Sequence, residues 1–243
     1  SIEIDSGISC GLRRSGIVVP FFNDKERDSY PTARFGKSLN RFELEQQVSG
    51  IDSTWQSGLL FEQDGQLDNR RRLMRALEKA CVCRGVHFQE GVEVLELVQN
   101  ENSFQGVKIS NAEGERKLIQ ADEAILCSGA WSGKILNELA IFPVKGQMFS
   151  VQAPKDALKR VLFGPGTYLV PREDGLIVVG ATSERDAGFA EGLTPFGQKQ
   201  LFDGMVALLP ESVKWPPMER WWGFRPCTPD NAPILGQSSI RGL

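Results

Sequence analysis

The hydrophobic pattern of the chain is clearest where two β-rich runs flank a short polar connection. The runs cover residues 167–172 and 176–181, and the connection is Glu-Asp-Gly at 173–175. Gly175 can take the positive φ that a three-residue hairpin loop needs. The pattern therefore predicts a β-hairpin.

The register of this hairpin places an aromatic side chain opposite a glycine. If Arg172 faces Leu176 across the loop, Tyr168 lies opposite Gly180. A phenol whose cross-strand neighbour lacks a side chain can lie over the sheet and direct its hydroxyl into the space above it. We therefore expect Tyr168 to face a space that binds a substrate.

Shorter apolar runs elsewhere predict further strands. These runs cover residues 16–22, 58–61, 86–97, 104–109, 117–120 and 147–151. The third, fourth and fifth of them follow one another closely and include a turn at residues 111–114. They are typical of a small antiparallel set.

Three amphipathic runs predict helices. The first covers residues 38–48, the second begins after the N-cap Asp68 and ends at Gly85, and the third begins at Thr194-Pro195 and ends before Pro210. Their expected apolar faces consist of Leu39, Phe42 and Leu44; of Leu73, Leu77, Ala80 and Cys81; and of Leu201, Met205, Leu208 and Leu209.

A strand followed by a glycine turn and a helix is expected around Ser128-Gly129. A short apolar strand precedes this turn, and the helix after it is expected to carry Trp131, Ile135, Leu136 and Leu139. Backbone N–H groups at such a turn can meet a phosphate or another polar ligand group. A nucleoside triphosphate site is excluded, because 129–134 is one residue short of a P-loop and Ile135 stands where Ser or Thr is needed.

Composition and charge narrow the classes of partner. The 243 residues are 41% hydrophobic and 24% charged, which is typical of a soluble globular protein. The formal charge is −3, and basic and acidic residues are interspersed. Neither a nucleic-acid footprint nor a polybasic membrane arm is present, so we expect a small molecule or another protein as partner.

The cysteine and histidine content argues against metal and triad chemistry. Five cysteines occur without CxxC spacing, which predicts reduced thiols in a cytosolic protein. The only histidine, His87, is expected in a loop or strand. A zinc site needs histidine together with other metal ligands, and a histidine-based triad needs it beside a nucleophile. A single histidine argues against both.

Two groups of arginines have alternative interpretations. Four of them, Arg70, Arg71, Arg72 and Arg75, could form an anion site or the solvated face of the second helix. Arg225 precedes a proline and has Trp221, Trp222 and Phe224 nearby, so its guanidinium is expected among apolar surfaces. Such an arginine needs an anionic partner, either a ligand or an internal acid such as Asp230 or Glu219.

Several motifs together resemble the family of FAD-dependent amine and amino-acid oxidases that contains D-amino acid oxidase, sarcosine oxidase and glycine oxidase. They are similar above all to the glycine oxidases of thiamine biosynthesis, in order and spacing over roughly residues 55–240. The motifs are Ile125-Leu-Cys-Ser-Gly-Ala-Trp-Ser132, Pro143-Val-Lys-Gly-Gln147, Tyr168-Leu-Val-Pro-Arg172, Val178-Val-Gly-Ala-Thr182, Gly223-Phe-Arg-Pro-Cys-Thr-Pro-Asp230 and Pro233-Ile-Leu-Gly236.

The resemblance implies roles for individual residues. Tyr168 matches the active-site tyrosine of the family, and Arg225 matches the arginine that holds the substrate carboxylate. Val94 matches the valine whose backbone meets the adenine end of FAD, and Ser128-Gly129 matches the turn beside the cofactor. The implied reaction oxidises the C–N bond of glycine or a small amino acid to an imine or oxo acid, with production of hydrogen peroxide.

The resemblance also implies the fold class and the domains. We expect an α+β fold with a large mixed, mainly antiparallel substrate-domain sheet, flanking helices and part of a three-layer ββα FAD-binding domain. Residues 1–64 and 141–225 are expected in the substrate domain, 65–140 in the middle of the FAD-binding domain, and 226–243 in the return toward it. A cytoplasmic location, a homo-oligomer and a link to thiazole synthase belong to the same expectation.

This chain departs from the family pattern at three places. The opening GxGxxG is absent, the closing flavin segment is absent, and Gly166 stands where glycine oxidases often have a histidine. We therefore expect a central fragment that holds no FAD by itself and is inactive alone. A sarcosine oxidase-type or D-amino acid dehydrogenase-type enzyme, or a non-catalytic domain that binds a carboxylate or a partner, stays open.

Overall fold

The computed structural model describes residues 1–243, which form two compact units. The first unit comprises residues 1–86, 146–183 and 191–222, and the second comprises 87–145, 184–190 and 223–243. The predicted domains follow different boundaries, since they group 65–86 with the FAD-binding part. The assignment of these residues to a substrate domain and an FAD-binding domain stays a prediction.

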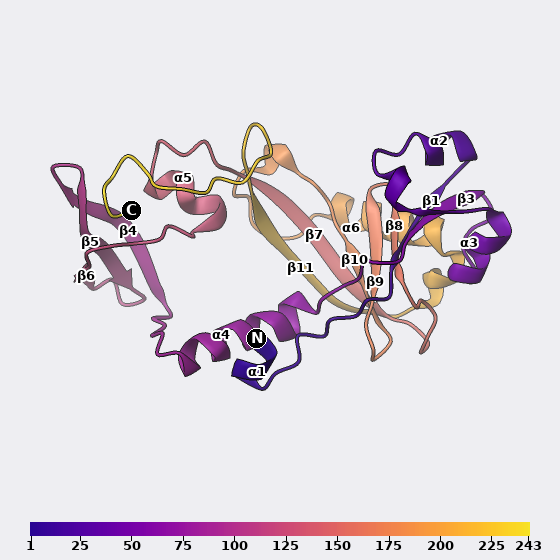
Figure 1. The fold of residues 1–243 in the computed structure, drawn as a ribbon, viewed down its shortest axis with the longest axis horizontal. Helices are drawn as coiled ribbons and strands as arrows, with labels where there is room; N and C mark the ends of the chain where they lie inside the picture. The colour runs from indigo at the N-terminus through magenta and orange to yellow at the C-terminus, as the bar shows by residue number, and fades with distance from the viewer. The chain divides into compact units, whose positions relative to one another are not determined.

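The secondary structure elements are labelled in Figure 1 where there is room. The helices are α1 (Ile2–Ser6), α2 (Asp24–Asp28), α3 (Arg41–Gln47), α4 (Met74–Cys83), α5 (Ser132–Ile135) and α6 (Pro195–Leu208), with the short turns η1 (Ala33–Phe35), η2 (Asn69–Leu73), η3 (Gly129–Trp131), η4 (Arg185–Ala187) and η5 (Pro210–Lys214). The strands are β1 (Ile17–Phe21), β2 (Lys37–Leu39), β3 (Ser57–Phe61), β4 (Val92–Asn100), β5 (Ser103–Asn111), β6 (Arg116–Gln120), β7 (Phe142–Gln152), β8 (Val161–Gly164), β9 (Thr167–Pro171), β10 (Leu176–Gly180) and β11 (Pro217–Cys227).

The strands form one large sheet and one small sheet. The large sheet has eight strands in the order β11-β7-β10-β9-β8-β1-β3-β2, and the small sheet has the order β4-β5-β6. The β1–β8 pair is parallel, whereas the pairings of β10 with β7 and β9 are antiparallel. The predicted α+β fold with a mixed, mainly antiparallel sheet is confirmed.

Alternation along the central strands separates a packed face from an open face. Phe149, Leu169 and Val179 point to the face that packs against Leu201 and Met205 of α6, and all five are buried in one core cluster. Full burial of one such side chain contributes roughly 1.5–3 kcal/mol. Because successive strand residues alternate in direction, the neighbours of these residues in sequence line the other face of the sheet.

The predicted hairpin is confirmed in strands and register. The backbone N–H of Arg172 donates to the carbonyl of Leu176 at 2.7 Å, and Gly175 has a φ of 83°. Tyr168 is paired with Gly180 across β9 and β10. The local turn chemistry was therefore sufficient to predict this element.

The predicted helices after Asp68 and Thr194 are also confirmed. The Asp68 side chain accepts from the Arg71 N–H, and its helix begins with the π turn η2 before α4. In α6 the Thr194 side chain accepts from the Gly197 N–H, with Pro195 in the first turn. Ala76 joins the expected apolar stripe of α4 as a buried residue.

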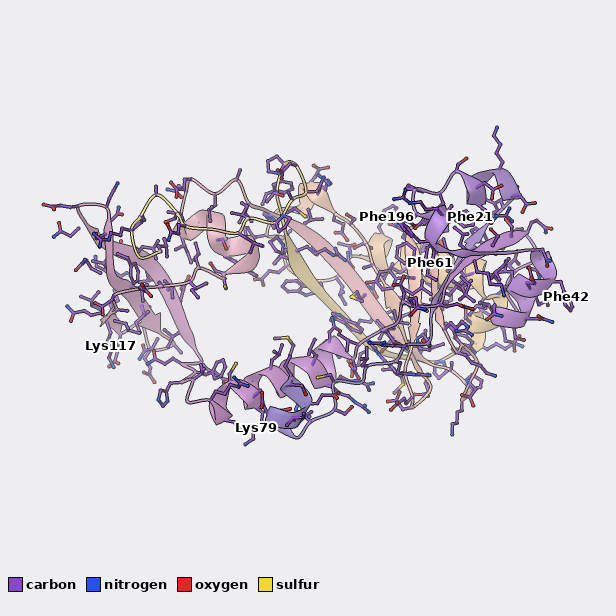
Figure 2. The ribbon with its side chains drawn as sticks, in the orientation of Figure 1. Phe21, Phe42, Phe61, Lys79, Lys117 and Phe196 are labelled. Atoms are coloured by element: carbon purple, nitrogen blue, oxygen red, sulfur yellow. The ribbon has the colours of Figure 1, made fainter.

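The expected apolar face of the helix at residues 38–48 is wrong at Leu39 and Phe42. Asn40 forms a capping box with Glu43, so α3 begins only at Arg41 and Leu39 belongs to β2. Leu39 and Leu44 are buried, but Phe42 is 71% exposed on α3 (Figure 2). With Asn40 as the N-cap, Leu39 lies outside the helix, and Leu44 is the buried residue of α3.

Three expectations for residues 86–139 also need correction. The strand expected from residue 86 begins at Val92, after Gly91 with a φ of 66°. The segment before Ser128 is not a strand, and Ile125 is 89% exposed. A strand needs a neighbour for its backbone hydrogen bonds, and no strand of this chain pairs with this segment. The helix expected to run from Trp131 to Leu139 is also shorter, since Trp131 belongs to the turn η3 and α5 ends at Ile135.

No helix here combines the length and the apolar character that crossing a membrane requires. All five cysteines are free thiols. His87 lies in the loop between α4 and β4. No group of three or more His, Cys, Asp or Glu side chains is placed to hold a metal ion.

Candidate functional site

A cavity of about 630 Å³ lies over the open face of the large sheet, within the first unit. Its floor is formed by side chains of β7, β9 and β10, and residues 65–71 with Met74 form another wall. Glu219 and Trp221 of β11 also line it. Cavities of this size are typical of small-molecule sites.

The floor follows from strand alternation. Tyr168 and Val170 of β9 point into the cavity, whereas Leu169 between them is fully buried in the core. On β10, Val178 lines the cavity and is paired with both Val170 and Ser150. The floor is therefore a mostly apolar surface with a phenol at one end.

Tyr168 lies over Gly180, as its register predicts. A β-carbon built on Gly180 would lie 2.7 Å from both Cζ and Oη of Tyr168, and 2.8 Å from Cε of Met148. Real β-carbons do not approach other atoms so closely. The ring can therefore occupy this position only because residue 180 has no side chain.

The arginines after Asp68 are paired with acids of the chain. Arg71 donates to Asp68 at 3.0 Å and to Asp174 at 3.1 Å, so it links the start of its helix to the hairpin loop. Arg70 forms an ion pair with Glu219, and its guanidinium lies 4.4 Å from the centre of the Trp221 ring. The structure therefore favours the interpretation of these arginines as a partly solvated helix face paired with acids, rather than as an anion site.

Gln66 joins the wall of the cavity to the end of its floor, and sequence reasoning missed it. The side chain is buried; Nε2 donates to the Pro171 carbonyl at 2.6 Å, and Oε1 accepts from Arg172 at 3.1 Å. Its backbone exchanges two hydrogen bonds of 2.9 Å with Arg13. Gln66 and Pro171 are 105 residues apart, so no local pattern indicates this contact.

Burial and charge shift the pKa values beside this wall. Burial lowers the pKa of the Arg172 guanidinium, because the charged form loses hydration. For Asp174, burial acts to raise the pKa, but hydrogen bonds from Arg71 and from the Leu176 N–H outweigh it and hold the pKa below its usual value. Asp174 therefore stays ionised and keeps its pairing with Arg71 at neutral pH.

Arg225 lies on β11 in the second unit and is exposed. Of the two acids considered as internal partners, Glu219 is paired with Arg70, and the Asp230 carboxylate accepts from the Ala232 N–H at 3.0 Å. Next to Arg225, Phe224 packs edge-on against Trp131 with ring centres 5.7 Å apart. The carboxylate-binding role of Arg225 stays a prediction.

The residues expected to meet FAD adjoin a cavity of about 690 Å³ within the second unit. Val94 of β4 and Ser128 both line it, and Gly129 follows Ser128 directly with a φ of 56°. No atom lies within 4 Å of a β-carbon built on Gly129, so the backbone there is open to a ligand. The other walls are mainly apolar and include Leu97 and Val107.

These walls fit the adenine end of FAD. A flat aromatic base needs apolar surfaces on its faces and a few polar groups at its edge. Here Val94 and Leu97 can supply the surfaces, and Ser128 can supply a hydroxyl and an open backbone. The apolar lining of this cavity and the open backbone at Gly129 are thus compatible with the predicted roles of Val94, Ser128 and Gly129.

The curated proteins that this chain resembles include a ThiO/ThiG protein and a glycine oxidase. The chain is 36% identical over 251 residues to the bifunctional protein ThiO/ThiG of Trichormus variabilis, a match that covers 100% of this chain and 37% of that protein. It is 35% identical over 155 residues to the glycine oxidase of Pseudomonas aeruginosa, covering 62% of this chain and 41% of that protein. The chain thus spans well under half the length of these curated relatives.

Solved structures share the fold. The glycine oxidase from Geobacillus kaustophilus superimposes with a TM-score of 0.87 at 24% sequence identity, over 99% of this chain and 67% of that chain. The L-proline dehydrogenase from P. horikoshii gives a TM-score of 0.84 at 19% identity, over 99% of this chain and 68% of that chain.

The family match extends over almost the whole chain. Residues 2–243 match the DAO family, described as FAD dependent oxidoreductase. This agrees with the resemblance carried by the sequence motifs, and FAD is the cofactor for which the family is described. The chain therefore belongs to the DAO family of FAD-dependent oxidoreductases.

Proposed function

We propose that the protein serves the FAD-dependent oxidation of glycine or another small amino acid. The substrate C–N bond is oxidised to an imine, which water can hydrolyse to an oxo acid, and dioxygen is reduced to hydrogen peroxide. The observation that carries this proposal is the phenol of Tyr168 held over Gly180 at the floor of the 630 Å³ cavity. The relatives named glycine oxidase support the same reaction.

Two side chains act on the substrate in this proposal. Tyr168 forms a wall of the site, and its hydroxyl hydrogen-bonds to the substrate. Arg225 binds the substrate carboxylate through two parallel N–H donors. A charge-assisted contact of this kind contributes about 1.5–3 kcal/mol. Binding and orientation are the tasks of these residues, because the reaction needs positioning more than acid–base groups.

The cofactor is held by the second unit in this proposal. Val94 meets the adenine end of FAD through its backbone, and Ser128-Gly129 lies beside the cofactor. When bound, FAD supplies the acceptor for the two electrons and the hydrogen removed from the substrate carbon. The open backbone at Gly129 and the apolar walls of the 690 Å³ cavity support this assignment.

A link to thiamine thiazole synthesis belongs to the same proposal. The sequence motifs resemble the glycine oxidases of thiamine biosynthesis, and one relative is named bifunctional protein ThiO/ThiG. We therefore infer thiazole synthase as a partner. A pull-down with purified thiazole synthase tests this partner separately from the oxidation.

The oxidation is tested by peroxide production from glycine, sarcosine and D-alanine in the complete protein with added FAD. We expect glycine-dependent peroxide, and a strong loss in Tyr168→Phe but not in the matched control Tyr30→Phe. Turnover only with a quinone would instead indicate a dehydrogenase. Binding of glycine without turnover by any acceptor would indicate the non-catalytic alternative and would refute the proposed oxidation.

A further inference from the structure

Phe163 lies parallel to Tyr168 on the neighbouring strand. The two residues are paired across β8 and β9. Their ring centres are 6.0 Å apart, and the ring planes differ by only 5°. Parallel rings at this separation are offset, which is one of the favoured geometries for an aromatic pair.

The direction of Phe163 follows from strand alternation. Leu162 is completely buried in the core, so Phe163 points to the opposite face of the sheet, where Tyr168 also lies. Phe163 is nevertheless 44% exposed and is not among the residues that line the cavity. Phe163 therefore does not line the cavity itself, but it contacts Tyr168, which does.

Tyr168 is bounded by three neighbouring strands. Gly180 of β10 lies beneath its ring, and Phe163 of β8 lies parallel to the ring. Met148 comes from β7, which pairs with β10 on the edge opposite β9, and its side chain also lies close to Gly180. Gly180 provides the space but cannot hold the ring in one orientation, because it has no side chain. Phe163 is the stacked ring that can do so.

We propose that Phe163 is a positioning residue, which holds the Tyr168 phenol flat over Gly180 and thereby sets where its hydroxyl enters the cavity. The inference rests on the proposed function, since it concerns the residue that is to contact the amino-acid substrate. An aromatic pair contributes enough beyond simple burial to change binding about 3–10-fold. Phe163 itself does not touch the substrate in this proposal.

The ring of Tyr168 can be observed directly by ¹⁹F NMR of protein labelled with 3-fluorotyrosine. The chain contains only two tyrosines, and the Tyr168 signal is the one lost in Tyr168→Phe. In Phe163→Leu we expect this signal to shift and broaden, because the ring loses its stacked neighbour. Phe42→Leu, at an exposed phenylalanine on α3, is the matched control and should leave the Tyr168 signal unchanged.

Kinetics then separate positioning from simple packing. We expect Phe163→Leu to raise the KM for glycine about 3–10-fold with a smaller effect on kcat, and Phe163→Tyr to restore it. An unchanged Tyr168 signal in Phe163→Leu would overturn the inference, whatever the activity. A shifted signal with unchanged KM would overturn the positioning role. Lack of amino-acid oxidation by the unmodified protein would instead refute the proposed function, while the ¹⁹F result stands independently.

Discussion

The phenol of Tyr168 lies over Gly180 so closely that residue 180 has no room for a β-carbon. The built β-carbon would lie 2.7 Å from Tyr168 Oη. Two strands, β9 and β10, bring these residues together, and their register makes them direct partners. The φ of Gly180 is not positive, so the backbone conformation does not require glycine there. The space taken by the Tyr168 ring does.

Gly180→Ala is expected to displace the Tyr168 ring and to destabilise the fold. Overpacking of a filled site typically costs about 1–3 kcal/mol. The free energy of unfolding from urea denaturation measures this cost. Gly223→Ala is the matched control, because no atom lies within 4 Å of a β-carbon placed at residue 223 and the φ of Gly223 is not positive. Equal stability of the two variants would show that the Tyr168 ring moves aside freely.

Gln66→Ala is expected to destabilise the junction between the cavity wall and the hairpin. The change removes the donor to the buried Pro171 carbonyl and the acceptor for Arg172. A buried group left without a partner costs about 1–3 kcal/mol. Urea denaturation measures the loss, and Gln56→Ala is the control, since its side-chain bond to the Ser53 carbonyl is exposed. A loss no larger than in this control would contradict the role of Gln66.

Asp174→Asn is expected to remove a pH-dependent contribution to stability. The folded pKa of Asp174 is lowered, so its contribution is present above the unfolded pKa, near 4, and is lost as pH falls through the folded value. The difference in unfolding free energy between wild type and variant should be largest at neutral pH and vanish in acid. Because the carboxylate is half exposed, we expect less than about 1 kcal/mol, reduced by salt. A difference independent of pH would contradict the pairing with Arg71.

Arg225→Lys is expected to weaken substrate binding in the complete protein. A lysine keeps the charge but loses the two parallel donors that match a carboxylate. The KM for glycine should rise roughly 10–100-fold, as loss of 1.5–3 kcal/mol implies. Arg220→Lys, five positions before it, is the control on the same strand. Kinetics equal to those of the control would remove Arg225 from the substrate site.

Elements specified by neighbouring residues could be predicted from the sequence. The loop at Gly175 determined the hairpin register, and the N-caps Asp68 and Thr194 determined where two helices begin. In contrast, the segment before Ser128 has a strand-like sequence but forms no strand, because strand formation also requires a partner.

The sequence by itself therefore determined the hairpin, the Tyr168–Gly180 pair and the membership of the family. Each depends on residues close together in the chain or on motifs in a fixed order. Only the tertiary structure decided that Gln66 bonds to Pro171, that Arg70 pairs with Glu219 across 149 residues, and that Phe163 stacks on Tyr168. These contacts depend on the order of strands in the sheet and on the packing of η2 beside it, which no local periodicity encodes.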